Sequence, residues 1–143
     1  MEKEYLIAVI IASLGLLIGY ILGNKLKKEV KQGRNYLFLL QKALFTVCIF
    51  IIMFEYRDIV HFVWIGALIL FLYYFYHKKA NQILIYAFFG ALAFLAYDYF
   101  IPLAGTQFLY GITTGSLNRK NTGLLFKSGI AYVIVAVLFI LLI

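Results

Sequence analysis

The feature that most constrains this chain is a series of six apolar runs separated by short polar connections. The runs cover residues 5–22, 36–54, 59–76, 83–101, 103–117 and 124–143. A helix needs about 20 apolar residues to cross the roughly 30 Å hydrocarbon core of a bilayer. Five of the runs approach this length. The fifth is shorter and would rise only about 22 Å as a helix, so it is expected to be short or broken.

The composition excludes an ordinary soluble domain. The chain has 143 residues, of which 65% are hydrophobic and 13% are charged, whereas soluble domains have about 25% charged residues. The runs are long and do not alternate as barrel strands do. A helix also satisfies its own backbone hydrogen bonds in lipid. We therefore expect an all-α integral membrane protein, a single polytopic domain over residues 1–143 with six, alternatively five, transmembrane helices.

The placement of the basic residues predicts a topology. If the N-terminus lies outside and all six runs cross, eleven basic residues fall inside and two fall outside. If residues 103–117 do not cross, the split is eight against five. Cytoplasmic loops carry an excess of Lys and Arg. The sequence therefore favours six crossings with the N-terminus outside, and the cell membrane as the location.

Glycines recur at intervals of four in two of the runs. Gly15, Gly19 and Gly23 lie on one face of the first expected helix, and Gly111 and Gly115 repeat the spacing in the fifth. Small residues at this spacing let two helices approach closely in a membrane. The first and fifth runs are therefore expected to be partners, with packing inside the chain and packing between subunits both open.

Polar side chains interrupt the fifth run. They are Thr106, Gln107, Thr113, Thr114 and Ser116. Polar groups at membrane depth usually face protein or a water-filled cavity, and short, glycine-interrupted segments hold substrate in transporters. The pattern predicts a ligand-binding or pore-lining wall. The alternative is a buried packing helix whose hydroxyl groups bond to its own backbone.

The segment after the fifth run, SLNRKNTG, indicates an anion site. Arg119 and Lys120 stand among hydroxyl and amide side chains, just before the sixth run. A guanidinium group presents a planar fork of donors, and turn N–H groups favour anions. The sequence therefore predicts a phosphate or lipid headgroup at this position. The alternative is a turn whose charges only set topology.

Other chemistry has little support in the sequence. Glu55, Asp58 and His61 are spaced by three residues, but a short solvated turn in which Arg57 pairs with a carboxylate explains them better than a metal site does. We predict no catalytic set, no metal and no cofactor. The chain has one cysteine, Cys48, so it forms no disulfide within itself. The basic residues do not alternate with aromatic residues, which argues against nucleic acid as a partner.

Three classes of function remain. The first is a transport or channel-type protein with residues 103–117 lining a path. The second is a non-catalytic accessory subunit of a larger membrane complex. The third is an enzyme that handles lipids or phosphorylated headgroups. The expected partners are the bilayer, anionic lipid headgroups at the cytoplasmic face, and either further copies of this chain or other membrane proteins.

Overall fold

A computed structural model describes residues 2–76, 81–96 and 98–141. These residues form seven α-helices and no strand. The helices are α1 (Glu2–Lys25), α2 (Lys27–Gln32), α3 (Arg34–Glu55), α4 (Val60–Tyr76), α5 (Gln82–Leu95), α6 (Phe100–Leu117) and α7 (Thr122–Leu141). The all-helical part of the fold prediction is thus confirmed over the described residues.

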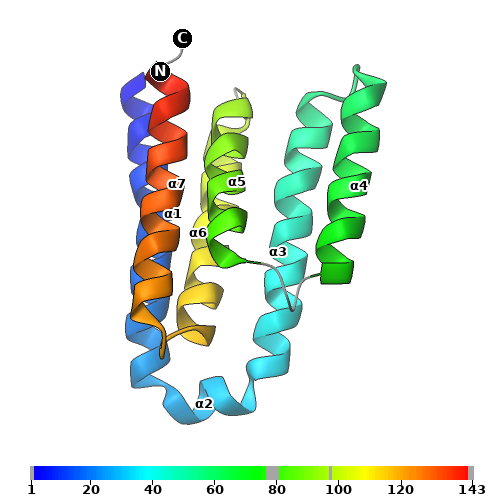
Figure 1. Ribbon diagram of the computed structural model, residues 1–143. Helices are drawn as coiled ribbons and strands as arrows, with labels where there is room; N and C mark the ends of the chain where they lie inside the picture. Colours follow the sequence, from blue (N-terminus) through cyan, green and yellow to red (C-terminus); the bar gives the residue numbers. More distant parts are fainter. Residues whose placement is uncertain (1, 77–80, 97, 142–143) are drawn as a thin grey trace.

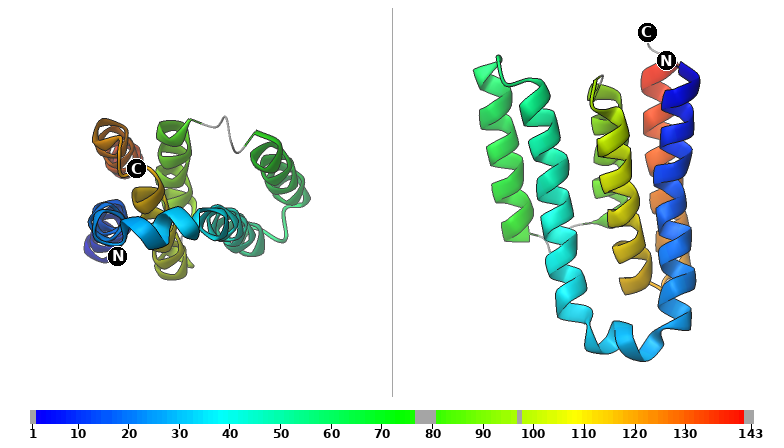
Figure 2. Two further views of the ribbon diagram at one scale, coloured as in Figure 1. Left: turned by 90° about the horizontal axis from the view of Figure 1, so that it is seen from below. Right: turned by 180° about the vertical axis from the view of Figure 1, so that it is seen from behind.

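The six longer helices run alternately up and down, and both termini lie at the same end of the bundle (Figure 1). The short helix α2 crosses the opposite end and connects α1 to α3 (Figure 2, left). The sequence leaves open whether the basic segment after the first run extends that helix or turns along a surface. In the structure α1 ends at Lys25, and the chain turns into α2 at Leu26.

The boundary between the fourth and fifth apolar runs differs from the expected one. The run 83–101 does not form one helix, since α5 ends at Leu95 and α6 begins at Phe100. Pro102 explains the new start, because proline lacks the N–H that a helix interior needs but fits its first turn. The expectation of a short or broken fifth helix is therefore wrong. The helix α6 is continuous over 18 residues, whereas α5 has 14.

The helix α6 occupies the centre of the bundle and contacts α1, α3 and α5. The helix α7 packs on α5, and α4 packs chiefly on α3 at the edge of the molecule (Figure 2). The core contains a cluster of aromatic rings. Phe45 stacks on Tyr73 with 3.7 Å between ring centroids, and Phe89 meets Tyr110 edge to face at 4.8 Å. These rings join α3, α4, α5 and α6.

Two of the described helices are long and apolar enough to cross a membrane by length and composition. They are α1, over Glu4–Lys25, and α3. The other apolar helices are shorter, over Val60–Phe75, Gln82–Leu95 and Thr122–Leu138. Large apolar side chains also remain exposed around the bundle. Trp64 is 72% exposed and Phe126 is also 72% exposed.

Candidate functional site

The helices α1 and α6 meet backbone to backbone through their glycines. A Cβ atom on Gly23 would lie 2.8 Å from the Cα of Ser116, and one on Gly111 would lie 2.9 Å from the carbonyl carbon of Gly15. A Cβ on Gly19 would overlap the carbonyl oxygen of Ile112. Gly15 and Gly115 face the partner backbone in the same way. No larger residue fits at this contact without moving one helix.

The polar side chains of α6 bond to the helices around it. Ser116 donates to the Gly19 carbonyl oxygen at 3.0 Å. Gln107 donates to the Phe89 carbonyl oxygen at 3.0 Å and accepts from the Tyr132 hydroxyl at 2.8 Å. These bonds tie α6 to α1, α5 and α7. Ser116 and Gln107 are buried, and the polar groups of both side chains form hydrogen bonds with protein atoms.

The threonines of α6 have two different surroundings. Thr114 is buried and accepts from the Gln41 amide at 2.6 Å, which joins α6 to α3. Thr113 and Thr106 donate to backbone carbonyls of α6 itself. Sequence reasoning missed Gln41, although its amide in the middle of an apolar run was a visible signal. The amide oxygen of Gln41, Oε1, has no hydrogen-bond partner among the described residues.

These side chains do not line the two cavities described next, with the exception of Ser116. Gln107 and Thr114 instead bond to neighbouring helices, and Thr113 bonds to the backbone of α6 itself. A path along α6 therefore stays a prediction.

A polar cavity of about 330 Å³ lies at the end of the bundle crossed by α2. We call it the basic pocket. Its polar lining consists of Lys31, Arg34, Ser116, Asn118, Arg119, Lys120 and Asn121. Two of the basic side chains, Lys31 and Arg34, come from the α2–α3 segment, and two, Arg119 and Lys120, come from the α6–α7 turn. Among the residues that the structure describes, the lining includes no acidic residue. The fold thus brings two remote basic segments together around one cavity.

Hydrogen bonds hold the α6–α7 side of the basic pocket. Arg119 donates to the carbonyl oxygen of Gly23 at the end of α1. Asn118 donates to the Thr114 carbonyl at 3.1 Å, and Asn121 accepts from the Leu124 N–H at 3.0 Å. Asn121 therefore caps the start of α7. The turn that carries Arg119 and Lys120 is fixed from both sides.

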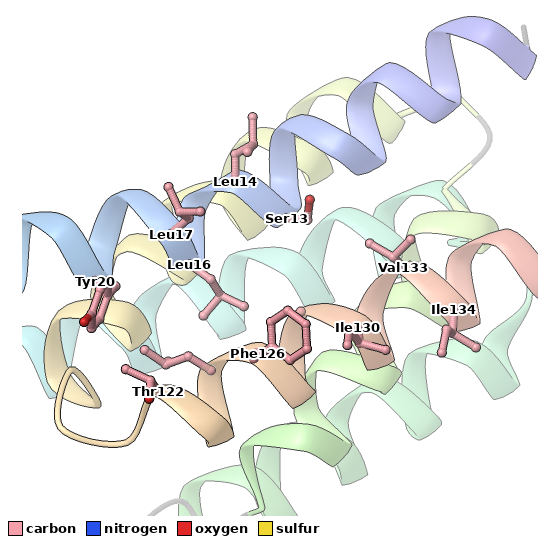
Figure 3. Close-up of a pocket in the computed structure, with 12 residues that line it drawn as sticks. Ser13, Leu14, Leu16, Leu17, Tyr20, Thr122, Phe126, Ile130, Val133 and Ile134 are labelled. Carbon is pink, nitrogen blue, oxygen red and sulfur yellow. The ribbon is translucent and has the colours of Figure 1, made fainter.

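A second cavity, of about 520 Å³, is an apolar groove between α1 and α7 (Figure 3). We call it the α1–α7 groove. Leu14, Leu17 and Tyr20 line it from α1, and Phe126, Ile130 and Ile134 line it from α7. Ser13 also reaches the groove, but its hydroxyl donates to the Ile10 carbonyl at 2.7 Å. The surface inside the groove is therefore almost entirely hydrocarbon.

Three acidic residues, Glu55, Asp58 and Asp98, lie at the other end of the bundle, whereas Glu29 lies in α2. Glu55 accepts from the backbone N–H of Asp98 at 3.0 Å, and the Tyr56 hydroxyl donates to the Leu95 carbonyl at 2.8 Å. Burial, together with the carboxylates of Glu55 and Asp98, raises the pKa of Tyr56 above its ordinary value. Within the described residues, no three His, Cys, Asp or Glu side chains come together in a group that could hold a metal.

Comparison with known proteins identifies no relative. No protein-family model matches the chain, and no curated protein and no solved structure is significantly similar to it. A function must therefore be inferred from the residues that line the basic pocket and the α1–α7 groove.

Proposed function

We propose that this chain is an integral membrane protein with six crossings that binds a phosphate-bearing anion in the basic pocket at its cytoplasmic end. One observation carries the proposal. Lys31, Arg34, Arg119 and Lys120, from two distant parts of the sequence, line a single cavity that contains no acidic side chain. Four positive charges repel one another at close range, and an anion between them removes that cost.

The distribution of charge supports the membrane orientation. The described basic residues at the α2 end include Lys25, Lys27, Lys28, Lys31, Arg34, Arg119 and Lys120. Lys78 and Lys79, assigned to this side from the sequence, lie outside the described residues. Glu55 ends α3, and Asp58 and Asp98 lie in the α3–α4 and α5–α6 connections, at the end of the bundle where the two termini also lie (Figure 1). At the α2 end, Glu29 is the acidic residue of α2. The excess of Lys and Arg marks the cytoplasmic side of a membrane protein.

The exposed apolar surface supports a lipid surrounding. Large apolar side chains of α1, α3, α4 and α7 face outward, where water would be unfavourable. The helix α5 rises only about 21 Å over its helical residues. A bilayer accommodates such a short helix by local thinning at modest cost. Six crossings are therefore compatible with the observed helix lengths.

Phosphate is the anion that best suits the basic pocket. Arg pairs with phosphate oxygens through two parallel N–H bonds, and Lys supplies a compact positive charge. The cavity of about 330 Å³ also has the size of a small-ligand site, which is commonly about 300–1,000 Å³. Asn118 and Asn121 add amide groups at its edge.

The lining favours binding over catalysis. It includes no carboxylate, imidazole or thiol that would act as a general base or nucleophile. Its hydroxyl group, on Ser116, already donates to the Gly19 carbonyl. We therefore place phosphate binding ahead of lipid-modifying chemistry. Transport and membership of a larger complex remain alternatives, and the basic pocket is evidence neither for nor against them.

The test is a binding measurement on the purified protein in neutral detergent. Inorganic phosphate and dioleoyl phosphatidic acid serve as probes. The variant carries Lys31→Ala and Lys120→Ala, and the control carries Lys27→Ala and Lys28→Ala, which remove the same charge from α2 residues outside the pocket lining. We expect the variant to bind at least one probe about tenfold more weakly than the control, because each bond to a charged group contributes about 1.5–3 kcal/mol. Equal binding by the two proteins contradicts the proposal.

A further inference from the structure

We infer that the ligand of the basic pocket is a membrane lipid with a phosphate headgroup, and that one of its acyl chains lies in the α1–α7 groove. This inference rests on the proposed function, because it assigns the phosphate to the basic pocket. It adds the source of the phosphate, a lipid and not a soluble ester, and a second part of the site.

The linings of the two cavities include consecutive residues where the α6–α7 turn enters α7. Asn121 lines the basic pocket, and the next residue, Thr122, lines the α1–α7 groove. Figure 3 shows Thr122 and Tyr20 at the end of the groove beside this turn, with Val133 and Ile134 toward the other end. A molecule held at Lys120 by its phosphate therefore has the mouth of the groove within reach.

The order of polar and apolar groups along the groove matches that of a lipid. The hydroxyl-bearing residues Tyr20 and Thr122 stand near the turn, whereas Ile130, Val133 and Ile134 line the rest of the groove with hydrocarbon. Ser13 also lies in that part, but its hydroxyl donates to the Ile10 carbonyl. Hydrocarbon gains free energy in such a lining roughly in proportion to the area removed from polar surroundings. A soluble phosphate ester would leave the groove unused.

The length and direction of the groove also fit a lipid in one leaflet. From Thr122 to Ile134 the helix α7 rises about 18 Å, and half of a hydrocarbon core is about 15 Å. The lining starts at Thr122, the first residue of α7, at the end assigned to the cytoplasm, and continues along α1 and α7 to Val133 and Ile134 (Figure 3). An acyl chain below a cytoplasmic headgroup takes this course.

Gly129 keeps the groove open. A Cβ atom at this position would meet only Leu16 Cδ1, at an ordinary 3.7 Å. By contrast, the α1–α6 glycines face backbone at distances that exclude any side chain. Close helix contact therefore does not account for a glycine at 129. Its missing side chain leaves space between α1 and α7 that a lipid chain fills.

The experiment compares two glycine substitutions in the full-length protein. Gly129→Leu places a side chain in the groove, and Gly105→Leu is the matched control, since a Cβ at Gly105 meets nothing within 4 Å. We expect Gly129→Leu to bind dioleoyl phosphatidic acid at least about tenfold more weakly than the control, because it displaces several methylene groups. Inorganic phosphate should bind both proteins equally. Thermal unfolding shows whether each variant is folded, and Ile130→Trp obstructs the same groove if Gly129→Leu does not fold.

The outcomes separate this inference from the proposed function. If Gly129→Leu and Ile130→Trp retain the lipid as Gly105→Leu does, the acyl chain lies elsewhere and the inference is overturned. The same holds if wild-type protein binds inorganic phosphate as tightly as dioleoyl phosphatidic acid. In both cases the basic pocket stands, provided that Lys31→Ala with Lys120→Ala still weakens phosphate binding. If that double variant binds both probes as its control does, the proposed function and the inference fail together.

Discussion

The α1–α6 contact and the α3–α4 edge are built in opposite ways. At the first, glycines bring two backbones together, and Ser116 donates to the Gly19 carbonyl across the contact. At the second, α4 packs chiefly on α3 and exposes Trp64 and Phe71 by 72% and 60%. In the lipid surrounding proposed above, apolar surface would gain nothing by leaving the solvent, so close packing and hydrogen bonds would decide which helices associate. The more polar helix is therefore central, and the more apolar one lies outside.

The largest effect is expected at the glycine contact. Gly19→Leu forces α1 away from α6, because its Cβ overlaps the Ile112 carbonyl oxygen. We expect a loss of about 3 kcal/mol or more in the free energy of unfolding, measured by denaturation in mixed detergent. Gly105→Leu is the control, and we expect it to unfold like the wild type. Equal stability of the two variants would show that the helices do not depend on this contact.

The buried hydrogen bonds should give the next largest effect. Gln107→Leu leaves the Tyr132 hydroxyl without its acceptor inside the core, which costs about 1–3 kcal/mol. Tyr132→Phe in the Gln107→Leu background should restore part of the loss. A double-mutant cycle on these two residues measures their coupling. Additive losses would mean that the bond between them contributes nothing.

A smaller effect is expected where α3 meets the α5–α6 turn. Tyr56→Phe removes the hydrogen bond to the Leu95 carbonyl and should cost about 1 kcal/mol. The folded protein raises the pKa of Tyr56 above that of an unfolded tyrosine, which is about 10. The stability that Tyr56 contributes is therefore complete below pH about 10. It declines at higher pH, because the tyrosine of the unfolded chain ionises first. Unfolding measured between neutral and alkaline pH checks this. A Tyr56→Phe protein that loses the same stability as the wild type at high pH contradicts the assignment.

The smallest effect is expected at the edge. Trp64→Leu replaces one exposed apolar side chain on α4 with another and should change the free energy of unfolding by less than about 0.5 kcal/mol. The same denaturation assay checks it. A loss comparable to that of Gln107→Leu would mean that Trp64 packs against another protein, since no described helix covers it. That outcome would favour the accessory-subunit alternative.

Helices with long apolar runs were predicted from the sequence. Features that depend on the packing of the whole fold were not. The helices α1 and α3 follow from long apolar runs that end in charged residues. The boundary between α5 and α6 was predicted at Pro102, several residues too late, because the residues around Asp98 are mostly aromatic and apolar and hydropathy continued across the actual break. Pro102 was the available signal for a new helix start.

The candidate site was predicted in part. The spacing of the glycines pointed to α1 and α6, and Arg119 and Lys120 stood out beside hydroxyl and amide groups. Lys31 and Arg34 were not assigned to the same pocket, because nothing local links α2 to the α6–α7 turn. The bond between Gln41 and Thr114 joins residues 73 positions apart. Such pairings arise from the packing of whole helices, which no local pattern encodes.

The bond from Arg119 to the Gly23 carbonyl oxygen has a consequence for ligand binding. The same guanidinium closes the end of α1 and lines the basic pocket, and it has five N–H donors. An anion that engages the remaining donors fixes the arginine and reduces fraying of the last turn of α1. Slower amide hydrogen exchange at the end of α1 would therefore report that an anion occupies the basic pocket, although the anion does not contact those amides.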